Sequence, residues 1–514
     1  MKTLKNILEF LEKSVEAYPE KYAFCDDRTD LTYMQLMLQA KAVGTFLLKY
    51  NVSKNPVAIL LDKTVTSISA FMGVVYSGGI YVVLDAHMPT GRMSSILQTL
   101  SPAAILTDHA HEGKAREVCT CAPILLMEDA CACQCDEEQL SKIRRLSIDT
   151  DPVYILFTSG STGNPKGTVV SHRSIIAYTE WVVETFQLNK DTVFGNQTPF
   201  FFSMSVLDIF STLCSSATMY IIPSSLFSFP LKLIEALHIH QVNTIYWVPS
   251  ALSIISNCQA FDYAAPPSMK TVLFAGEVMP AKVLNYWAEH LPEAMLANLY
   301  GPTEVTDICT CYIVNRTFAN YESIPIGKAC GNCDVLLITP DGREAGLGEE
   351  GEIYVRGSFL SMGYYNDPEK TAEVFVQNPL NRHYPELVYR TGDLAKYNEY
   401  GELQYIARRD MQIKHMGYRI ELGEIDAAAC AVNGVECCAA LYDPQTDQIL
   451  LFYQGSSVDE AALTKELRTR LPKYMLPANL IRLRQMPYNQ NGKIDRAALK
   501  KEYQCTIKEV STHG

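Results

Sequence analysis

The sequence lacks the features of several protein classes. A transmembrane helix needs about 18 consecutive apolar residues. The sequence contains no such run, so we expect no transmembrane helix. It has no basic run to offset a net charge of −13, which argues against a nucleic-acid partner. Charges interrupt the helical pattern of residues 1–24, so that segment is not a signal peptide. We therefore expect a cytoplasmic protein.

Two common nucleotide-binding signatures are also missing. A P-loop requires Gly-x4-Gly-Lys-Ser/Thr, which does not occur, and the glycine fingerprint of a Rossmann fold, Gly-x-Gly-x2-Gly between a strand and the helix it opens, is absent as well. No internal repeat is present. Cysteine, in contrast, is abundant with 16 residues, five of which lie within 119–135. Their Cys-x-Cys spacing is not that of a zinc knuckle and no histidine pair follows, so we interpret them as reduced thiols, with zinc as the alternative.

The alternation of short β-branched runs with helix-length segments predicts an α/β fold. The runs are Val57–Leu61, Tyr81–Leu84, Ala104–Leu106, Val153–Leu156, Thr168–Val170, Met219–Ile222, Thr244–Val248 and Thr271–Phe274. Strands separated by helices form mostly parallel sheets covered by helices. After Pro325, segments rich in Gly, Glu and Tyr indicate a small antiparallel or barrel-like subdomain.

A chain of 514 residues is too long for one core. A strand-like run gives way to charges at Arg408-Arg409-Asp410. We therefore predict a large N-terminal domain over 1–409 and a small C-terminal α+β domain over 410–514.

The most informative stretch is the loop Phe157–Gly167, which follows one predicted strand and leads into another. Its hydroxyls, glycines and Lys166 can converge on phosphate oxygens. A Ser/Gly surface linker is the alternative, but linkers seldom join two buried strands.

Four further motifs carry residues suited to ATP chemistry. Asn298–Glu304 combines an aromatic, a turn and a carboxylate; Tyr389–Leu394 contains a turn aspartate; Arg408–Glu421 is a basic cluster; and Asn489–Arg496 holds a lysine behind an Asn-Gly turn. Each alone has a plain structural interpretation, as a strand end, a turn, a solvated face or a surface turn.

Together and in this order, the five motifs resemble the adenylate-forming superfamily of acyl-CoA synthetases, luciferases and peptide-synthetase adenylation domains. Within this superfamily the chain most resembles free-standing amino-acid adenylation domains and D-alanyl carrier protein ligases. Two segments carry this closer resemblance, Gly78-Gly79-Ile80-Tyr81 and Gly351-Glu352-Ile353. The resemblance covers nearly the whole chain. It implies ATP and Mg²⁺ as cofactors and a mobile C-terminal lid domain.

The resemblance also implies a role for each motif residue. Lys493, Thr303 and the Mg²⁺ ligand Glu304 would be catalytic, and Asp393 would bind the ribose. The ATP-binding residues would be Thr158, Ser159, Gly160, Ser161, Thr162, Gly163, Lys166, Asn298, Tyr300, Gly301, Asp393, Tyr405 and Arg408. Tyr300 would stack on adenine. Asp410 would be the hinge, and Lys414 and Gly417 would serve the thiolation step.

The acid pocket follows from the same resemblance. Its residues would be Phe202, Ser203, Met204, Leu207, Ser250, Leu273, Ala275, Leu299, Asp307 and Ile308. Enzymes for α-amino acids have an aspartate where this chain has Ser203, and a buried ammonium without a partner costs several kcal/mol. Either the substrate lacks an α-amino group, or its cation is met elsewhere, or the serine is an engineered change. Asp307 is one candidate for a displaced amine, as in a β-amino acid; alternatively it points outward or is capped by Thr306 and Ser250. Asp208 is expected to be structural.

The predicted function is ATP-dependent adenylation of a small carboxylic acid, followed by transfer of the acyl group to the phosphopantetheine of a separate carrier protein. An acyl-CoA or aryl-CoA ligase is the nearest alternative, and Ser203 favours it. A non-catalytic nucleotide-binding relative is a third, but it would be expected to lack Lys493, Glu304 or Asp393, and all three are present. No carrier or condensation motif is seen, so we expect a free-standing enzyme.

Overall fold

The computed structural model describes residues 4–119, 121–159, 165–264, 266, 268–409, 412–444, 446–455, 458–488, 494–496, 498–501 and 503. The chain divides into two compact units. The first comprises Met1–Ala86, Leu97–Phe157 and Gly167–Arg409. The second comprises His87–Ile96, Thr158–Lys166 and Asp410–Gly514, as far as these are described.

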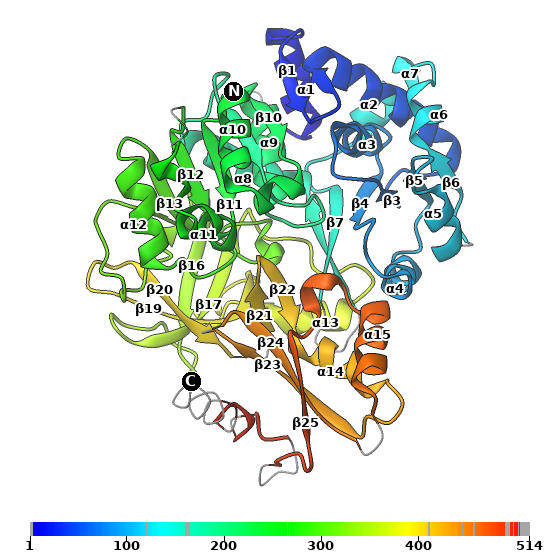
Figure 1. Ribbon diagram of the computed structural model, residues 1–514. Coiled ribbons are helices and arrows are strands. Elements are labelled where there is room, and N and C mark those ends of the chain that lie inside the picture. Colours follow the sequence, from blue (N-terminus) through cyan, green and yellow to red (C-terminus); the bar gives the residue numbers. More distant parts are fainter. Residues whose placement is uncertain are drawn as a thin grey trace. The chain divides into compact units, whose positions relative to one another are not determined.

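A six-stranded sheet lies in the N-terminal half of the first unit (Figure 1). Its order is β6 (Ile124–Leu126), β5 (Ala104–Thr107), β3 (Pro56–Leu60), β4 (Ile80–Leu84), β7 (Pro152–Thr158) and β8 (Lys166–Ser171). The strands from β6 to β7 run parallel. Every residue of β3 and β4 is buried, as expected for strands covered on both faces.

The second sheet has nine strands and positions most of the predicted site. Its order is β15 (Lys328–Ala329), β14 (Thr310–Ile313), β13 (Met295–Tyr300), β12 (Thr271–Phe274), β11 (Thr244–Trp247), β9 (Val193–Asn196), β10 (Thr218–Ile221), β1 (Tyr22–Cys25) and β2 (Asp30–Thr32). The strands from β13 to β1 are parallel. Their carboxyl ends therefore lie at one edge, where open α/β sheets bind ligands.

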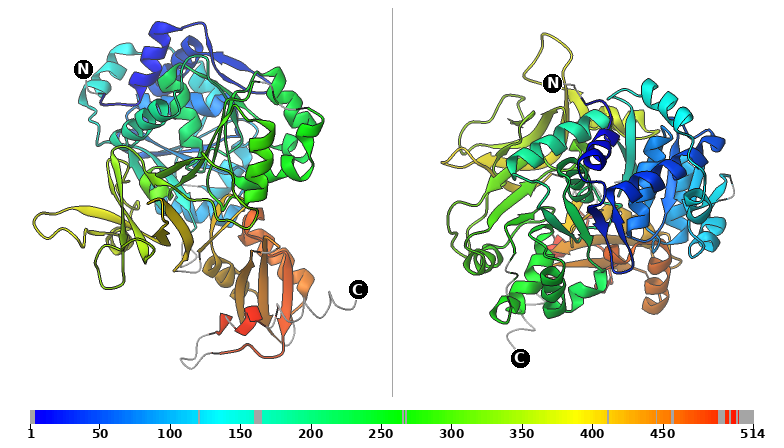
Figure 2. Two further views of the ribbon diagram at one scale, coloured as in Figure 1. Left: turned by 90° about the vertical axis from the view of Figure 1, so that its left-hand side faces the viewer. Right: turned by 90° about the horizontal axis from the view of Figure 1, so that it is seen from above.

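Helices cover both sheets. Among those that pack on one another are α1 (Leu8–Ala17), α2 (Tyr33–Leu47), α3 (Val65–Tyr76), α8 (His172–Thr185) and α9 (Ser205–Ser215), with α1 beside α2 and α9 (Figure 2). The others in this half are α4 (Thr90–Leu100), α5 (Glu112–Val118), α6 (Met127–Cys131), α7 (Glu137–Leu146), α10 (Pro230–Ile239), α11 (Pro249–Asn257) and α12 (Ala281–His290). Helix α2 begins with a capping box between Thr32 and Gln35.

The predicted antiparallel subdomain completes the first unit. It consists of β16 (Cys333–Ile338), β17 (Glu350–Gly357), β19 (Leu387–Tyr397), β18 (Phe375–Gln377) and β20 (Leu403–Arg408), with α13 (Pro368–Val374). All of its strand pairs are antiparallel. The predicted combination of mostly parallel sheets with a small antiparallel subdomain is thus present.

The described part of the second unit has a core of its own. The hairpin of β21 (Gln412–His415) and β22 (Tyr418–Glu421) turns through Met416 and Gly417, which both have positive φ, as a type I′ hairpin turn requires. A three-stranded sheet follows, made of β23 (Cys437–Asp443), β24 (Gln448–Gln454) and β25 (Asn479–Leu483). Helices α14 (Leu422–Cys430) and α15 (Glu460–Arg470) contribute to its buried cluster.

Two negative findings apply to the described residues. None of their helices is long and apolar enough to cross a bilayer. No group of three or more His, Cys, Asp or Glu side chains among them is arranged to hold a metal ion, and this holds for the described cysteines of 119–135 as well.

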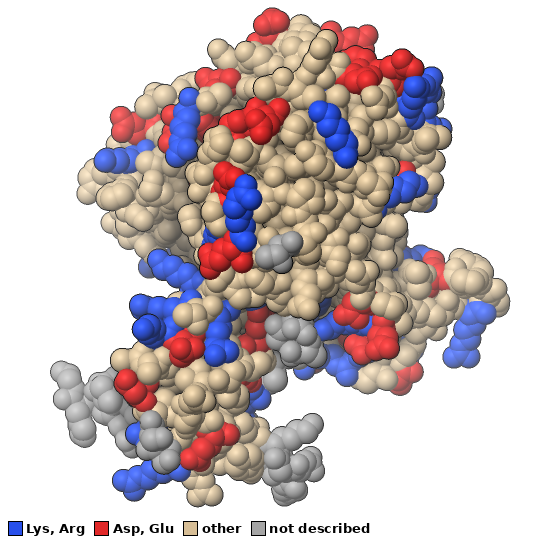
Figure 3. Space-filling model, turned by 90° about the vertical axis from the view of Figure 1, so that its right-hand side faces the viewer, with Lys and Arg blue, Asp and Glu red and all other residues tan. Residues whose placement is uncertain are grey.

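On the face of the molecule shown in Figure 3, the Lys and Arg side chains lie interspersed with those of Asp and Glu.

Candidate active site

A strained turn follows β13 and aims two predicted site carboxylates inward. Thr306 has φ 73° and ψ −56°, and the Asp307 amide donates to the Val305 carbonyl at 2.9 Å. This three-residue turn is rare, and such a conformation costs on the order of 1–3 kcal/mol for a β-branched residue. The Thr306 hydroxyl donates to the Phe359 carbonyl at 2.7 Å, which helps to hold the turn. As a result Glu304 and Asp307 are both buried.

Gly301 permits this turn to fold back on the strand. A Cβ at this position would lie 2.2 Å from the Asp307 carbonyl oxygen and 2.5 Å from the Ile308 Cα. Both of these atoms are backbone and cannot move aside. Only glycine therefore fits between β13 and the residues after the turn.

Glu304, the predicted Mg²⁺ ligand, is held by the antiparallel subdomain. The Tyr364 hydroxyl donates to its carboxylate at 2.6 Å, and the Ser361 amide donates to its main-chain carbonyl at 2.9 Å. A single fixed carboxylate fits Mg²⁺, which usually takes one or two carboxylates and completes its shell with water and substrate phosphates.

The predicted ribose-binding acid, Asp393, has two partners. The Tyr300 hydroxyl donates to one oxygen at 2.5 Å and Arg408 donates to the other at 3.1 Å. Burial, with the negative charge of Asp393, raises the pKa of Tyr300 well above its usual value, so the phenol remains a donor. The Tyr405 ring lies 6.4 Å from that of Tyr300. These contacts bring together four predicted ATP-binding residues, while adenine stacking on Tyr300 stays a prediction.

The predicted acid pocket meets the predicted phosphate site at one pair of hydroxyls. Thr303 donates from its hydroxyl to that of Ser203 at 3.3 Å. Leu207, Leu273, Ala275, Leu299 and Ile308 are buried, whereas Phe202, Ser203 and Ser250 are partly exposed. Leu273 and Leu299 lie near the carboxyl ends of β12 and β13. Five of the apolar residues predicted for the pocket are thus buried, and that they line an acid pocket stays a prediction.

Asp307 has partners that the sequence did not indicate. Its Oδ2 accepts from the Tyr178 hydroxyl at 2.7 Å and from the Tyr246 hydroxyl at 3.2 Å. Burial, with the Asp307 charge, raises the pKa of both tyrosines well above their usual value. The capping that we considered from Thr306 and Ser250 is not what the structure shows. The Thr306 hydroxyl bonds Phe359, and the Ser250 amide donates to Glu277 at 2.8 Å.

Of the described residues of the predicted phosphate loop, Thr158, Ser159, Pro165 and Lys166 cluster with the second unit, and Phe157 and Gly167 with the first. Ser159 donates from its hydroxyl to the Arg419 carbonyl at 2.7 Å and accepts from the Glu421 amide at 3.2 Å. The Thr158 hydroxyl is buried and has no hydrogen-bond partner among the described residues. Lys166 begins β8, Lys414 lies in β21, and Gly417 lies in the hairpin turn. Outside the described residues lie Gly160, Ser161, Thr162, Gly163, Asp410 and Lys493.

Sequence analysis missed the group that fixes the last residues of the first unit. Glu352 is buried, and its carboxylate accepts from Arg390 at 3.0 Å and from Arg409 at 2.6 Å. The Arg409 amide also donates to the Gly392 carbonyl at 2.9 Å. The Gly-Glu segment that contains Glu352 was noticed only as a family likeness, because nothing in it indicates two arginine partners.

Comparison with known proteins identifies a matching family and relatives that align with almost the full chain. The AMP-binding enzyme family matches residues 11–365. The chain belongs to that family. It is 32% identical over 519 residues to a D-alanine--D-alanyl carrier protein ligase of Bacillus mycoides (strain KBAB4), covering 96% of this chain and 99% of that protein. It is equally 32% identical, over 511 residues, to the ligase of the same name from Bacillus cytotoxicus.

Solved structures share the fold. The crystal structure of IdnL1 superposes with a TM-score of 0.82 at 26% identity, over 95% of this chain and all of that one. The Vibrio cholerae adenylation domain AlmE, solved with glycyl-adenosine-5'-phosphate, has a TM-score of 0.84 at 23% identity, over 98% of this chain and 99% of that one. These matches confirm the predicted fold class and the predicted membership of an adenylate-forming ligase superfamily, and ATP use follows from the family.

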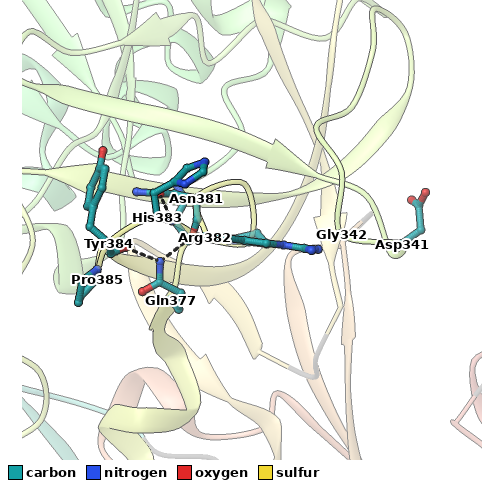
Figure 4. A pocket seen from close by; sticks show the side chains of 10 residues that line it. Asp341, Gly342, Gln377, Asn381, Arg382, His383, Tyr384 and Pro385 are labelled. Atoms are coloured by element: carbon teal, nitrogen blue, oxygen red, sulfur yellow. Dashed lines mark hydrogen bonds between the residues drawn. The ribbon is translucent and has the colours of Figure 1, made fainter.

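A separate hollow of about 630 Å³ lies in the antiparallel subdomain (Figure 4). Asp341 and Gly342 contribute to it from one loop and residues 377–385 from another. Gln377 donates to the carbonyls of Asn381 at 2.8 Å and Tyr384 at 3.2 Å, which ties the second loop to itself. None of the predicted site residues lines this hollow.

Proposed function

We propose that the protein activates a small carboxylic acid with ATP to an acyl-adenylate, releases pyrophosphate, and transfers the acyl group to the phosphopantetheine thiol of a separate carrier protein. The contact between Thr303 and Ser203 carries this proposal. It joins the residue assigned to the α-phosphate with the residue at the mouth of the acid pocket. A carboxylate and an α-phosphate must meet at one place for an acyl-adenylate to form.

In the adenylation step, different described residues would bind different parts of ATP and its metal ion. Asp393, fixed by Tyr300 and Arg408, would orient the ribose, and the Thr303 hydroxyl would donate to the α-phosphate. Glu304, fixed by Tyr364, would hold Mg²⁺, which when bound neutralises phosphate charge. Positioning and electrostatic stabilisation therefore account for most of the catalysis that we propose.

The proposed transfer of the acyl group to a carrier protein is supported by the relatives of this chain. Proteins that are 32% identical over almost the full chain are named ligases for a carrier protein. We propose the same acceptor class here, and we retain Lys493 as the lysine of the adenylation step. We also retain a division into a core over 1–409 and a lid over 410–514 with the pivot at Asp410, and a cytoplasmic location. The segments 87–96 and 158–166, which cluster with the second unit, would belong to the core in that division.

Mass spectrometry of an acylated carrier tests the proposal. A phosphopantetheinylated carrier protein is incubated with the enzyme, ATP, Mg²⁺ and a mixture of small acids, and its mass should rise by that of one acid less water. CoA at the same concentration is the parallel acceptor. A carrier that stays unmodified while CoA is acylated would refute the carrier-protein step and establish the alternative.

That alternative, an acyl-CoA or aryl-CoA ligase, is favoured by one observation. Ser203 places a neutral hydroxyl, hydrogen-bonded to Thr303, where a carboxylate would pair with an α-ammonium. Acids without an α-amino group need no such partner. The alternative therefore predicts activity with those acids and with CoA together.

A further inference from the structure

Two cysteine thiols are in contact in the described part of the second unit. Cys430 is the last residue of α14 and Cys438 is the second residue of β23, and their sulfur atoms lie 3.2 Å apart. They are eight positions apart in the chain, so the fold brings them together. A disulfide bond is about 2 Å long, and the two sulfurs therefore need to approach by only about 1 Å to form one.

The two thiols differ in exposure and in hydrogen bonding. Cys430 is exposed, whereas Cys438 is buried in the apolar cluster of this unit. Cys438 donates its S–H to the Asp426 carbonyl at 3.2 Å, so Cys430 is the donor in the contact between the sulfurs. Burial, followed by the contact with Cys430, raises the pKa of Cys438. Cys430 is therefore the thiol that a dissolved reagent reaches and reacts with first.

Asp426 connects this thiol pair with the segment that follows Lys493. Its carbonyl accepts from Cys438, and its carboxylate accepts from the Ala440 amide at 2.5 Å and pairs with Arg496. Arg496 lies three positions after Lys493, the lysine that we propose for the adenylation step. A movement of α14 relative to β23 therefore moves the residue that anchors Arg496.

We propose that Cys430 and Cys438 form a reversible oxidation site, at which a small-molecule disulfide converts the two thiols to an intramolecular disulfide that slows adenylation. The effect on adenylation rests on the proposed function, whereas the formation of the disulfide does not. In a reducing compartment such as the cytoplasm, disulfides are usually transient and serve catalysis or redox sensing. A regulatory role fits an oxidation site outside the residues assigned to ATP and the acid.

The exchange takes place in two steps. The Cys430 thiolate attacks one sulfur of the small disulfide, which gives a mixed disulfide and releases one small thiolate. Cys438 then gives up its proton, and its sulfur attacks that of Cys430 and releases the second small thiolate. The two protein thiols thus lose two protons and two electrons, and the small disulfide gains both and becomes two thiols. The second step is intramolecular, between sulfurs already in contact, so the mixed disulfide should not accumulate.

The disulfide should disturb the adenylation step through Asp426. Its closure draws the end of α14 toward β23 and removes the S–H that Cys438 donates to the Asp426 carbonyl. The ion pair between Asp426 and Arg496 transmits the shift to the segment that follows Lys493. A misplacement of about 1 Å can cost an enzyme about 100-fold in rate. We therefore expect oxidation to slow pyrophosphate exchange at least about tenfold.

Peptide mapping tests the formation of the disulfide. The folded protein is incubated with excess oxidised glutathione, its remaining thiols are blocked, and it is cleaved after glutamate, which separates Cys430 from Cys438 at Glu436. The two peptides should be joined, with a mass two hydrogens below their sum, and dithiothreitol should release them. Because Cys437 lies on the same peptide as Cys438, the variant Cys437→Ser should retain the link. A Cys430 that stays free or bound to glutathione, or a link that is lost in Cys437→Ser, would overturn the assignment.

Acid-dependent exchange of pyrophosphate into ATP tests the effect on adenylation. The oxidised wild type should be at least about tenfold slower than the reduced protein and should recover with dithiothreitol. Cys430→Ser should keep the activity of the reduced protein and lose the sensitivity to oxidised glutathione. The matched control is Cys121→Ser, which removes the exposed member of a thiol pair in the first unit, Cys119 and Cys121, whose sulfurs lie 3.6 Å apart. It should stay as sensitive as the wild type.

Two results would overturn the effect on adenylation. One is a Cys430→Ser variant as sensitive to oxidation as the wild type, and the other is a fully formed disulfide with unchanged exchange. If the reduced protein exchanges no pyrophosphate with any acid, the proposed adenylation itself fails and the effect on it fails as well. The peptide map then still decides whether the disulfide forms.

Discussion

The hydroxyl of Tyr364 donates a 2.6 Å hydrogen bond to the carboxylate of Glu304. Both residues are buried, and they lie 60 positions apart in the chain, one after β13 and the other after β17. The antiparallel subdomain thereby fixes the orientation of the carboxylate that we assign to Mg²⁺. A hydrogen bond to a charged group contributes about 1.5–3 kcal/mol.

Tyr364→Phe should therefore weaken the metal site while leaving the fold intact. We expect the Mg²⁺ concentration for half-maximal exchange to rise about tenfold, and binding of Mn²⁺ with ATP, followed by electron paramagnetic resonance, to weaken in parallel. Tyr365→Phe, which changes the adjacent tyrosine, is the control and should leave both values unchanged. An unaltered Mg²⁺ requirement in Tyr364→Phe would show that the hydroxyl does not position Glu304.

Gly301→Ala should damage the site through the backbone. The added methyl group would overlap the Asp307 carbonyl and the Ile308 Cα, so the strand and the turn must separate. We expect loss of exchange activity and a fall of several degrees in the thermal unfolding midpoint. Gly342→Ala is a surface control, because nothing lies within 4 Å of a Cβ there, although its φ of +83° makes it mildly unfavourable. An unfolding midpoint lower in Gly342→Ala than in Gly301→Ala would contradict this explanation.

Ser203→Asp should introduce a partner for an α-ammonium. The new carboxylate would stand beside Thr303, at the junction of the acid and phosphate sites. We expect kcat/KM for alanine to rise about tenfold or more, while that for propionate falls, because a buried carboxylate without a cation is costly. Ser203→Asn supplies the size without the charge. An equal response of alanine and propionate would show that position 203 does not face the substrate amine.

The stability of the first unit should depend on pH through His172. Burial, followed by the positive charge of Arg144, lowers its pKa from 6.5 to about 3. Between these values the folded protein binds fewer protons than the unfolded chain, so this stability is full above pH 6.5 and is lost as the pH falls toward 3. The loss between pH 7.5 and 5.5 is about 1.3 kcal/mol.

Denaturant unfolding at these two pH values, in the wild type and in His172→Asn, measures that loss. The variant lacks the titrating ring, and its stability should fall by about 1.3 kcal/mol less over this interval. The variant also loses the hydrogen bond from the Ile7 amide to the ring, which lowers its stability at both pH values. The quantity to compare is therefore the change in unfolding free energy between the two pH values, and not the free energy itself. Identical pH dependence in the two proteins would exclude His172 as the cause.

Much of the fold could be predicted from the sequence because its signals are local. The β-branched run at Val57–Leu61, for example, lies within one residue of β3 at both ends. The motif Asn298–Glu304 was also recognisable, since its residues are adjacent in the chain. The division into two domains stays a prediction.

The remaining features depend on contacts between distant residues. Asp307 was chosen correctly as a buried carboxylate, but its partners Tyr178 and Tyr246 lie 129 and 61 residues away. The turn at Thr306 could not be predicted from the sequence either, because its residues Val, Thr and Asp do not favour a positive φ. Asp208 was assigned a structural role, which stays a prediction, and its hydrogen bond from Asn196 is likewise a contact that the sequence does not reveal.

The central claim is that an acyl-adenylate forms where Thr303 and Ser203 meet. Exchange of labelled pyrophosphate into ATP, measured across small acids for the wild type and for Thr303→Val, tests it most directly. The account predicts exchange that requires one class of acid in the wild type and falls at least about 100-fold in Thr303→Val with ATP still bound, as for loss of a transition-state donor. A wild-type protein that binds ATP and exchanges no pyrophosphate with any acid, or a Thr303→Val variant of full activity, would contradict it.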